Sequence, residues 1–271
     1  MKKITIILSL LCLCASVATH GQSDSSFQFL KSIKGEFSWF NIDNLNNVYV
    51  LTNNSQLKKI DEKGDSVAVF NDVKRYGNPY SIDVTNPFKI LLYYKNFSTV
   101  VILDRLMTVR NTINFRNQNI FSVQAIATSY DNNIWLFDEQ DYKLKKIDET
   151  GKILQETTDW RSIFDSVPSP NRLIDRDNLV YVYDPEKGFY IFDYYTGFKN
   201  KLPFLSWGDV EVSGKNVYGF RDNTLYSYEL NSLVMKEYKL PPFFGNYQGI
   251  KAMNGKVYVN KGDRIDIYQV K

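Results

Sequence analysis

The sequence predicts an all-β protein, a six-bladed β-propeller built from four-stranded antiparallel blades. The first observation is an internal repeat, because residues 57–64 read LKKIDEKG and residues 144–151 read LKKIDETG, about two blade lengths apart. The second is an apolar strand ending in a polar residue, which recurs at positions 61, 104, 148, 193, 229 and 269. The third is the spacing of apolar residues, which alternate or form short runs and so favour strands over helices.

Each repeat is expected to contain four strands that follow one another as an antiparallel meander. Inner strands are predicted at 39–43, 81–84, 123–127, 173–175, 209–212 and 249–252. Second strands follow at 48–51, 90–94, 134–137, 179–183, 217–220 and 257–259. Outer strands are recognisable at 66–70, 109–115, 153–157 and 235–240. The turns between second and third strands are rich in Asn, Asp and Gly, which is typical of hairpins.

The predicted blades span approximately 37–70, 80–115, 122–158, 171–203, 206–240 and 248–271. The last of them has three strands of its own, whereas the segment 27–33 (FQFLKSI) precedes the first inner strand and belongs to no other blade. We expect this N-terminal strand to pair into the last blade and to close the ring. The closure would remove an unpaired strand edge, which is a site for aggregation.

The first 21 residues have the parts of a secretory signal peptide. Two lysines open the chain, residues 4–18 are almost all apolar, and small residues lead up to a cleavage site near Gly21-Gln22. The apolar part is too short for a comfortable membrane span, and no other run approaches that length. We therefore expect a signal peptide at 1–21, a single propeller domain at 22–271, and export to the periplasm or to the cell surface.

Removal of the signal peptide would also remove the only histidine, His20, and both cysteines, Cys12 and Cys14. The mature chain would then have no disulfides, no thiol or imidazole catalysis, and no metal held by Cys or His. A lipoprotein, in which one of the cysteines carries the lipid, is an alternative, although leucine rather than a small residue precedes each of them.

The charge of the chain gives no sign of a nucleic-acid or anionic-lipid partner. Lys and Arg number 33 against 30 Asp and Glu, and two of the lysines belong to the signal peptide. The remainder is close to neutral and has no basic run. The chain is instead rich in Tyr and Phe, 19 and 18 residues, which suits β-structure and packed interfaces.

The blade rhythm resembles that of bacterial exported six-bladed propellers of the NHL-like and TolB-like group. The resemblance covers the whole mature chain, but the WD dipeptide and the sialidase box are missing from the repeat positions. It therefore implies a fold rather than an activity. The Gly21-Gln22 junction and the many aromatic and Asn residues also resemble exported proteins of Bacteroidota.

One functional alternative is an enzyme that uses carboxylates of the central channel. Exported propellers that resemble lactonases place acidic and amide side chains around a divalent metal there. In this chain the inner strands and their edges carry Asp43, Asp83, Asp175, Asp209 and Glu211. Such oxygen ligands suit Ca²⁺, which would make the chain a Ca²⁺-dependent hydrolase or lactonase. The other interpretation is structural, because a wet channel accommodates polar side chains in any propeller.

The connections between blades are rich in aromatic residues and predict a binding surface. The candidate residues are Tyr76, Tyr80, Trp160, Arg161, Trp207, Phe243, Phe244 and Tyr247. Aromatic side chains with an Arg are typical of the residues that dominate protein interfaces. The same rings could instead fill the wedges between blades. The insertion at 158–170 is the longest segment outside the repeat, and we expect it to be specific to a partner.

Two further sequence patterns concern residues that we expect at the surface of the protein. Ser66 and Ser166 lie in Asp-Ser-Val triplets, which match the short O-glycosylation pattern of Bacteroidota proteins. The lysine pairs at 58–59 and 145–146 are expected to be solvated residues of alternating strands rather than a ligand site.

The sequence as a whole favours a non-enzymatic exported interaction module. In this interpretation a rigid ring presents its aromatic loops to an envelope protein complex and needs no cofactor. The Ca²⁺-dependent hydrolase remains the alternative, and the oligomeric state is left open.

Overall fold

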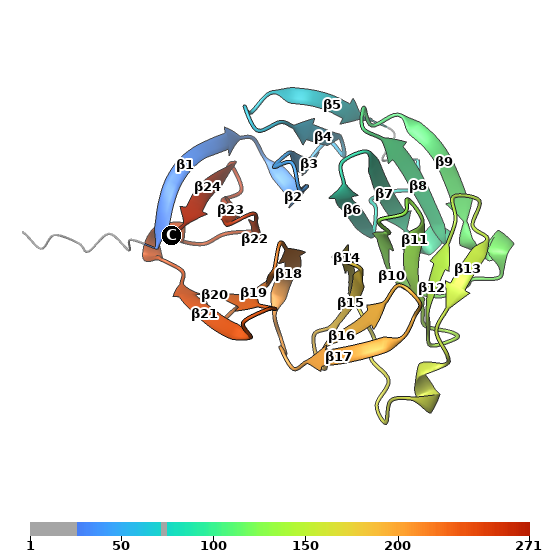
Figure 1. Ribbon diagram of the computed structural model, residues 1–271. Helices are drawn as coiled ribbons and strands as arrows, with labels where there is room; N and C mark the ends of the chain where they lie inside the picture. The colour runs from blue at the N-terminus through green and yellow to red at the C-terminus, as the bar shows by residue number, and fades with distance from the viewer. Residues whose placement is uncertain (1–25, 72–74) are drawn as a thin grey trace, which may run out of the picture.

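The computed structural model describes residues 26–71 and 75–271 and confirms the predicted all-β propeller. Six four-stranded antiparallel sheets are arranged as blades around a central axis (Figure 1). The predicted signal peptide, with His20 and both cysteines, lies outside the described residues. Within them, no helix has the length and apolar character needed to cross a membrane.

Each blade is a meander in which the inner strand comes first along the chain. Blade 1 contains β2 (Phe37–Ile42), β3 (Val48–Thr52), β4 (Leu57–Ile60) and β5 (Ser66–Phe70). Blade 2 contains β6 (Ser81–Asn86), β7 (Lys89–Tyr94), β8 (Thr99–Asp104) and β9 (Val109–Asn114). Blade 3 contains β10 (Val123–Thr128), β11 (Ile134–Asp138), β12 (Lys143–Ile147) and β13 (Ile153–Glu156).

The second half of the ring repeats this order. Blade 4 contains β14 (Arg172–Arg176), β15 (Leu179–Asp184), β16 (Gly188–Asp193) and β17 (Phe198–Leu202). Blade 5 contains β18 (Gly208–Ser213), β19 (Asn216–Arg221), β20 (Thr224–Glu229) and β21 (Val234–Lys239). Blade 6 contains β22 (Gly249–Met253), β23 (Lys256–Asn260), β24 (Arg264–Val270) and β1 (Phe27–Lys34). Short 3-10 turns are η2 (Lys95–Phe97), η3 (Phe115–Gln118), η4 (Trp160–Ser162) and η5 (Pro242–Phe244).

The core lies between neighbouring blades. One apolar cluster, for example, joins Leu51 and Leu57 of blade 1 to Ile90 and Leu92 of blade 2. Because such strands are covered on both faces, every side chain of β7 and β11 is buried. Outer strands have only one packed face, and β13 and β17 are largely exposed. Burial on both faces explains why the second strands read as short continuous apolar runs.

The fourth strand of blade 6 is β1, which pairs antiparallel with β24 and places Phe27 opposite Val270. The ring of Phe27 packs edge-on against Tyr238 and Phe244, with centroids 6.3 and 5.2 Å away. Ile33, near the other end of the strand, is buried in an apolar cluster with blade 1. The N-terminal strand therefore contacts the blades on both sides of blade 6.

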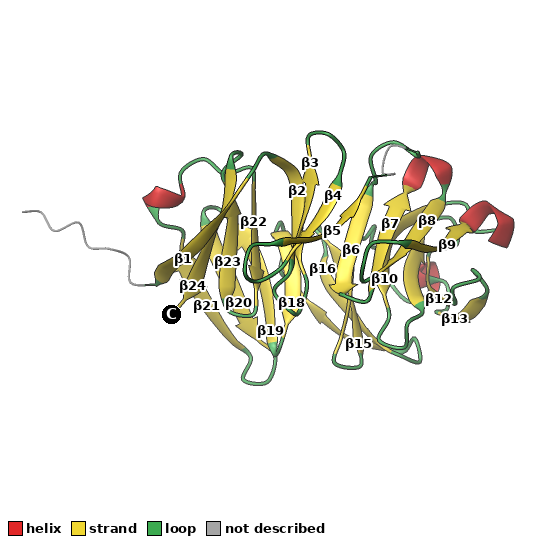
Figure 2. Cartoon of the chain, turned by 90° about the horizontal axis from the view of Figure 1, so that it is seen from above, coloured by secondary structure: helices red, strands yellow, loops and turns green. Residues whose placement is uncertain are grey.

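The meander divides the turns between two faces of the ring, which Figure 2 shows from the side. Inner-to-second turns and third-to-outer turns emerge on one face, because successive antiparallel strands reverse direction. We call this the hairpin face; its inner turns lie at 44–47, 87–88, 130–133, 177–178, 214–215 and 254–255. Second-to-third turns and the connections between blades emerge on the opposite face, which we call the loop face.

The expectation that the repeated lysine pairs are solvated was wrong. Lys145 and Lys146 are 2 % and 5 % exposed, because the third strand of a blade is packed between its neighbours. The Lys145 Nζ lies 2.8 Å from a carboxylate oxygen of Asp138 and also pairs with Asp141. Burial lowers the pKa of Lys145, but these two carboxylates outweigh it and leave the pKa raised.

Candidate functional site

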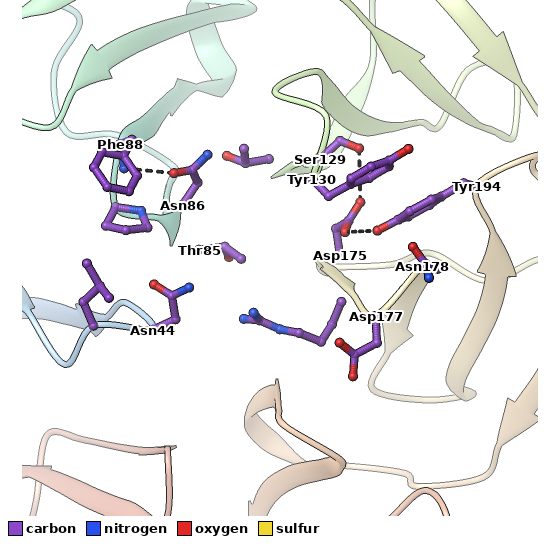
Figure 3. A pocket seen from close by; sticks show the side chains of 14 residues that line it. Asn44, Thr85, Asn86, Phe88, Ser129, Tyr130, Asp175, Asp177, Asn178 and Tyr194 are labelled. Atoms are coloured by element: carbon purple, nitrogen blue, oxygen red, sulfur yellow. Dashed lines mark hydrogen bonds between the residues drawn. The ribbon is translucent and has the colours of Figure 1, made fainter.

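A cavity of about 440 Å³ opens on the hairpin face, beside the central axis. Its lining comes from the inner turns of blades 1 to 4 and from Tyr194, which follows β16. Figure 3 shows Phe88 on one side of the cavity and the paired rings of Tyr130 and Tyr194 on the other. The cavity thus depends on four blades that are distant in sequence and adjacent in space.

The wall between blades 3 and 4 is built around the buried carboxylate of Asp175. One carboxylate oxygen accepts hydrogen bonds from the Trp135 indole and the Ser129 hydroxyl, at 2.9 and 3.1 Å. The other accepts from the Tyr194 hydroxyl at 2.6 Å. Burial raises the pKa of Asp175 above its usual value, while these hydrogen bonds oppose the rise by favouring the ionised form. The carboxylate therefore joins two blades.

An aromatic stack covers this carboxylate on the hairpin face. The rings of Tyr130 and Tyr194 are parallel within 6°, with their centroids 4.3 Å apart. The Lys146 ammonium lies 5.5 Å from both ring centroids and 5.1 Å from that of Trp135. Lys146 also pairs with Asp131. Burial and then the neighbouring Asp175 raise the pKa of Tyr194, so its hydroxyl stays protonated and donates.

Two polar side chains of the cavity lining have no partner among the described residues. The guanidinium of Arg176, at the end of β14, makes no hydrogen bond or ion pair with residues 26–71 or 75–271, and its Nε is buried. Thr128, at the end of β10, is 3 % exposed, and its Oγ1 likewise has no hydrogen-bond partner there. Buried polar groups are usually paired, so this local exception is a candidate for ligand contact.

The mouth of the cavity carries apolar turn tips from three consecutive blades. These are Leu45, Phe88 and Tyr130, with exposed fractions of 54 %, 59 % and 65 %. Each follows an inner strand by a few residues and lines the cavity. Isolated exposed apolar residues are common, whereas three around one cavity form a surface with the character of an interface.

The carboxylates predicted for Ca²⁺ are distributed over four blades and are bound to other groups. Asp43 accepts hydrogen bonds from the backbone of Leu45 and Asn47 at 2.9 Å, and from the hydroxyl of Tyr49 at 3.1 Å. Asp83 accepts from the Thr128 backbone N–H at 2.6 Å and so joins blades 2 and 3.

The remaining two carboxylates of that group also have structural partners. Asp209 pairs with Lys251 of blade 6 at 2.8 Å, and Glu211 pairs with Arg172 of blade 4 at 3.1 Å. Within residues 26–71 and 75–271, no three side chains of His, Cys, Asp or Glu approach one another closely enough to hold a metal ion. The geometry gives these carboxylates the role of joining blades and turns.

Three of the aromatic residues predicted for binding are buried between blades. Trp160 stacks on Phe192 with centroids 5.1 Å apart, and Trp207 stacks on Phe204 at 4.5 Å. Phe244, in η5, is 1 % exposed. These rings therefore fill the wedges between blades, the alternative that the sequence had left open.

A glycine makes room for one of these rings. A Cβ at Gly219 would lie 2.4 Å from the Trp207 ring, so only glycine allows Trp207 to pack against β19 at this distance. The Trp207 backbone is fixed as well, because its N–H donates to the Tyr183 hydroxyl at 2.7 Å.

The other predicted loop residues differ in exposure. Tyr80 and Phe243 are about half exposed, whereas Tyr76 and Tyr247 are half-buried. Arg161 is exposed, but its guanidinium bonds to the carboxylate of Asp159. The loop face thus keeps two well-exposed aromatic rings from the predicted set.

The predicted insertion at 158–170 forms one wall of a second cavity, of about 970 Å³, on the outer rim of blade 4. Phe164 and Ser166 of the insertion line it together with Tyr190 and Phe198. The Phe164 ring packs edge-on against Tyr190 and Phe198, with centroids 4.9 and 5.2 Å away. Ser66 and Ser166, the two predicted modification sites, are both exposed.

The cavity residues Arg176, Thr128, Phe88, Tyr130 and Tyr194 were not predicted as site residues. Their sequence signal is positional, since all lie at or just after the hairpin-face ends of strands. None of them is a carboxylate or lies in a connection between blades.

Comparison with known proteins supports the fold. No protein-family model and no curated protein sequence matches this chain. Among solved structures, virginiamycin B lyase from Staphylococcus aureus is 15 % identical with a TM-score of 0.56, covering 86 % of this chain and 80 % of its own. The Pan2 WD40 domain from Neurospora crassa is 9 % identical with a TM-score of 0.58, covering 90 % and 95 %. At these identities the similarity is one of fold.

Proposed function

We propose that this chain is a non-enzymatic, exported interaction module that binds a protein partner of the cell envelope through its hairpin face. The observation that carries the proposal is the set of three exposed apolar tips, Leu45, Phe88 and Tyr130, around a cavity of about 440 Å³. Exposed apolar side chains around a concave site that holds a few polar groups are typical of a binding surface.

The surrounding structure favours rigid presentation of this surface. Asp83 and Asp175 each accept hydrogen bonds from the neighbouring blade, which fixes the inner turns relative to one another. The Tyr130 ring is held by its stack on Tyr194. A surface whose residues are already ordered loses little conformational entropy on binding.

The carboxylates that an enzymatic mechanism would need have other roles in this structure. Asp43, Asp83 and Asp175 accept hydrogen bonds from turns and from adjacent blades, and Asp209 and Glu211 form ion pairs between blades. This is why we place binding, rather than Ca²⁺-dependent hydrolysis, at the centre of the proposal.

The test is recovery of partners from gently solubilised envelope of the producing organism. With a tagged protein that carries Phe88→Ala and Tyr130→Ala, the recovered amount of any stoichiometric partner should fall at least about tenfold. The reason is that large aromatic side chains in an interface dominate its affinity. A matched variant with Tyr80→Ala and Phe243→Ala on the loop face should retain it. Circular dichroism and thermal unfolding check that both variants fold.

The reverse result would contradict the proposal. Loss of the partner only in the Tyr80→Ala, Phe243→Ala variant would move the interface to the loop face. Recovery of the unaccompanied protein from every preparation would refute the module interpretation itself.

A further inference from the structure

We propose that the hairpin-face cavity recognises a carboxylate of the bound protein, an acidic side chain or a chain end, and that Arg176 is the residue that pairs with it. This inference rests on the proposed function, because it names the chemistry of the partner at the same site. It assigns a specific role to a residue that is not part of the blade core and that forms no ion pair in the described part of the chain.

The first argument is the state of the Arg176 guanidinium. It lines the cavity, it is partly buried, and within residues 26–71 and 75–271 it forms no hydrogen bond, ion pair or ring contact. A guanidinium has five N–H donors and loses hydration when it is partly buried. The other partly buried arginine on this inner strand, Arg172, is compensated by Glu211 at 3.1 Å. Among the residues that the structure describes, Arg176 has no such carboxylate.

The second argument is independent and comes from Thr128. Its side chain is 3 % exposed, it lines the same cavity, and its hydroxyl has no hydrogen-bond partner in the described part of the chain. The Thr128 backbone N–H, in contrast, is bonded to Asp83. A carboxylate has two oxygens, so one can accept from a guanidinium while the other accepts from a hydroxyl.

The acidic residues of the lining do not compete for Arg176. Asp175 already accepts from Trp135, Ser129 and Tyr194. Asp177 pairs with Lys215 at 3.3 Å. The lining therefore presents a single uncompensated positive charge, which suits a carboxylate better than a phosphate dianion that would also face two acidic residues.

The rim of the cavity defines what accompanies the carboxylate. Phe88 and Leu45 are more than half exposed at the mouth. A group that places its charge on Arg176 shares the cavity with these apolar side chains and can contact them. An apolar residue next to an acidic residue, or an apolar C-terminal residue, satisfies both requirements.

The test uses the purified protein and a small probe, N-acetyl-phenylalanine, which carries a free carboxylate beside an aromatic ring. Its matched control is the neutral N-acetyl-phenylalaninamide, and inorganic phosphate is a third ligand. The readout is the nitrogen–proton NMR signal of the Trp135 indole, which donates to Asp175 in the cavity wall. We expect this signal to shift with the carboxylate and to stay in place with the amide and with phosphate.

The variants identify the responsible side chains. Arg176→Gln should weaken binding of N-acetyl-phenylalanine at least about tenfold, because the charged partner of the carboxylate is lost. Arg176→Lys should restore part of the affinity. Thr128→Val, which keeps the shape of the side chain, should weaken binding by a smaller factor. None of the three removes a side-chain hydrogen bond within residues 26–71 and 75–271, so indole signals like those of the unmodified protein are expected without probe.

Several results would overturn the inference. These are equal binding of the amide, tighter binding of phosphate, no binding of any probe, or binding of N-acetyl-phenylalanine to the Arg176→Gln variant with unchanged affinity.

The envelope experiment distinguishes failure of this inference from failure of the proposed function. If Arg176→Gln abolishes probe binding but the Phe88→Ala, Tyr130→Ala variant still recovers its partner, the cavity binds carboxylates and the docking proposal fails. If the partner is lost from the double variant but Arg176→Gln affects neither assay, docking stands and the role of Arg176 fails.

Discussion

At the scale of single residues, Asp175 shows how this propeller uses a buried charge. Its carboxylate accepts from Trp135 and Ser129 of blade 3 and from Tyr194 of its own blade. Burial raises its pKa, so the folded state favours the protonated acid more than the unfolded chain does. The stability from this group is therefore fully present below its unfolded pKa and is lost as the pH rises through the folded pKa.

Two substitutions of Asp175 should therefore have different effects on the free energy of unfolding. Asp175→Asn keeps an acceptor for Trp135 and removes the buried charge, so its free energy of unfolding at neutral pH should be equal to or about 1 kcal/mol above that of the unmodified protein. Asp175→Ala should be destabilised by several kcal/mol, since each buried donor left unpaired costs about 1–3 kcal/mol. The advantage of Asp175→Asn should shrink toward about pH 4. Urea unfolding checks this, and equal losses in both variants would contradict it.

At the scale of elements, β1 joins blade 6 to the blades on both sides of it, in addition to the pairing that the sequence predicts. It is the outer strand of blade 6, and its two ends contact different neighbouring blades. Ile33 is 7 % exposed within the cluster shared with blade 1, whereas Leu30 on the same strand is 43 % exposed. The strand therefore offers a buried position and a matched exposed position.

Aspartate at these two positions should have different effects. Ile33→Asp places an unpaired charge in an apolar cluster and should lower the free energy of unfolding by about 3–5 kcal/mol. Leu30→Asp should change it by no more than about 0.5–1 kcal/mol, because the side chain remains in water. The measurement is urea unfolding followed by tryptophan fluorescence. Similar effects of both substitutions would show that β1 is not packed as described.

The strands and turns also show which structural features could be predicted from the sequence. The blades were predictable because strand periodicity and turn composition are local and repeat along the chain. The burial of Lys146 and Trp160 could not be predicted from the sequence, since it depends on which blade covers them. The cavity was harder still, because Phe88, Tyr130 and Arg176 come from three blades and meet only through the ring. Exposure and adjacency are properties of the assembled ring rather than of any local segment.

At the scale of the whole molecule, tyrosine is a large part of the packing between blades. Burial raises the pKa of Tyr181 and of Tyr183 to about 12, and it also raises the pKa of other tyrosines. These are Tyr49, Tyr93, Tyr194, Tyr218, Tyr258 and Tyr268. Each of these tyrosine hydroxyls stays protonated in the folded protein at a pH at which it is ionised in the unfolded chain. Their contribution to stability is present below about pH 10 and is lost as the pH rises through the folded values.

The protein should therefore lose stability steeply in alkali. Each such tyrosine adds about 1.4 kcal/mol per pH unit to the slope once the unfolded chain is ionised. The urea midpoint should fall sharply between about pH 9 and about pH 11. Near-ultraviolet absorbance should show a subset of tyrosines that ionise only as the protein unfolds. Ionisation of all tyrosines near their usual pKa, with no loss of stability, would contradict this.

The pairing of β1 with β24 also has a mechanical consequence. The strands are antiparallel, and the backbone N–H of Lys271 donates to the carbonyl of Ser26 at 2.9 Å, so both strand ends leave the ring at the same point. A force that pulls these ends apart loads the inter-strand hydrogen bonds one after another, as in unzipping, instead of all together, as in shear. Tension across the two ends should therefore peel β1 away at low force, whereas the five blades formed from continuous chain resist longer.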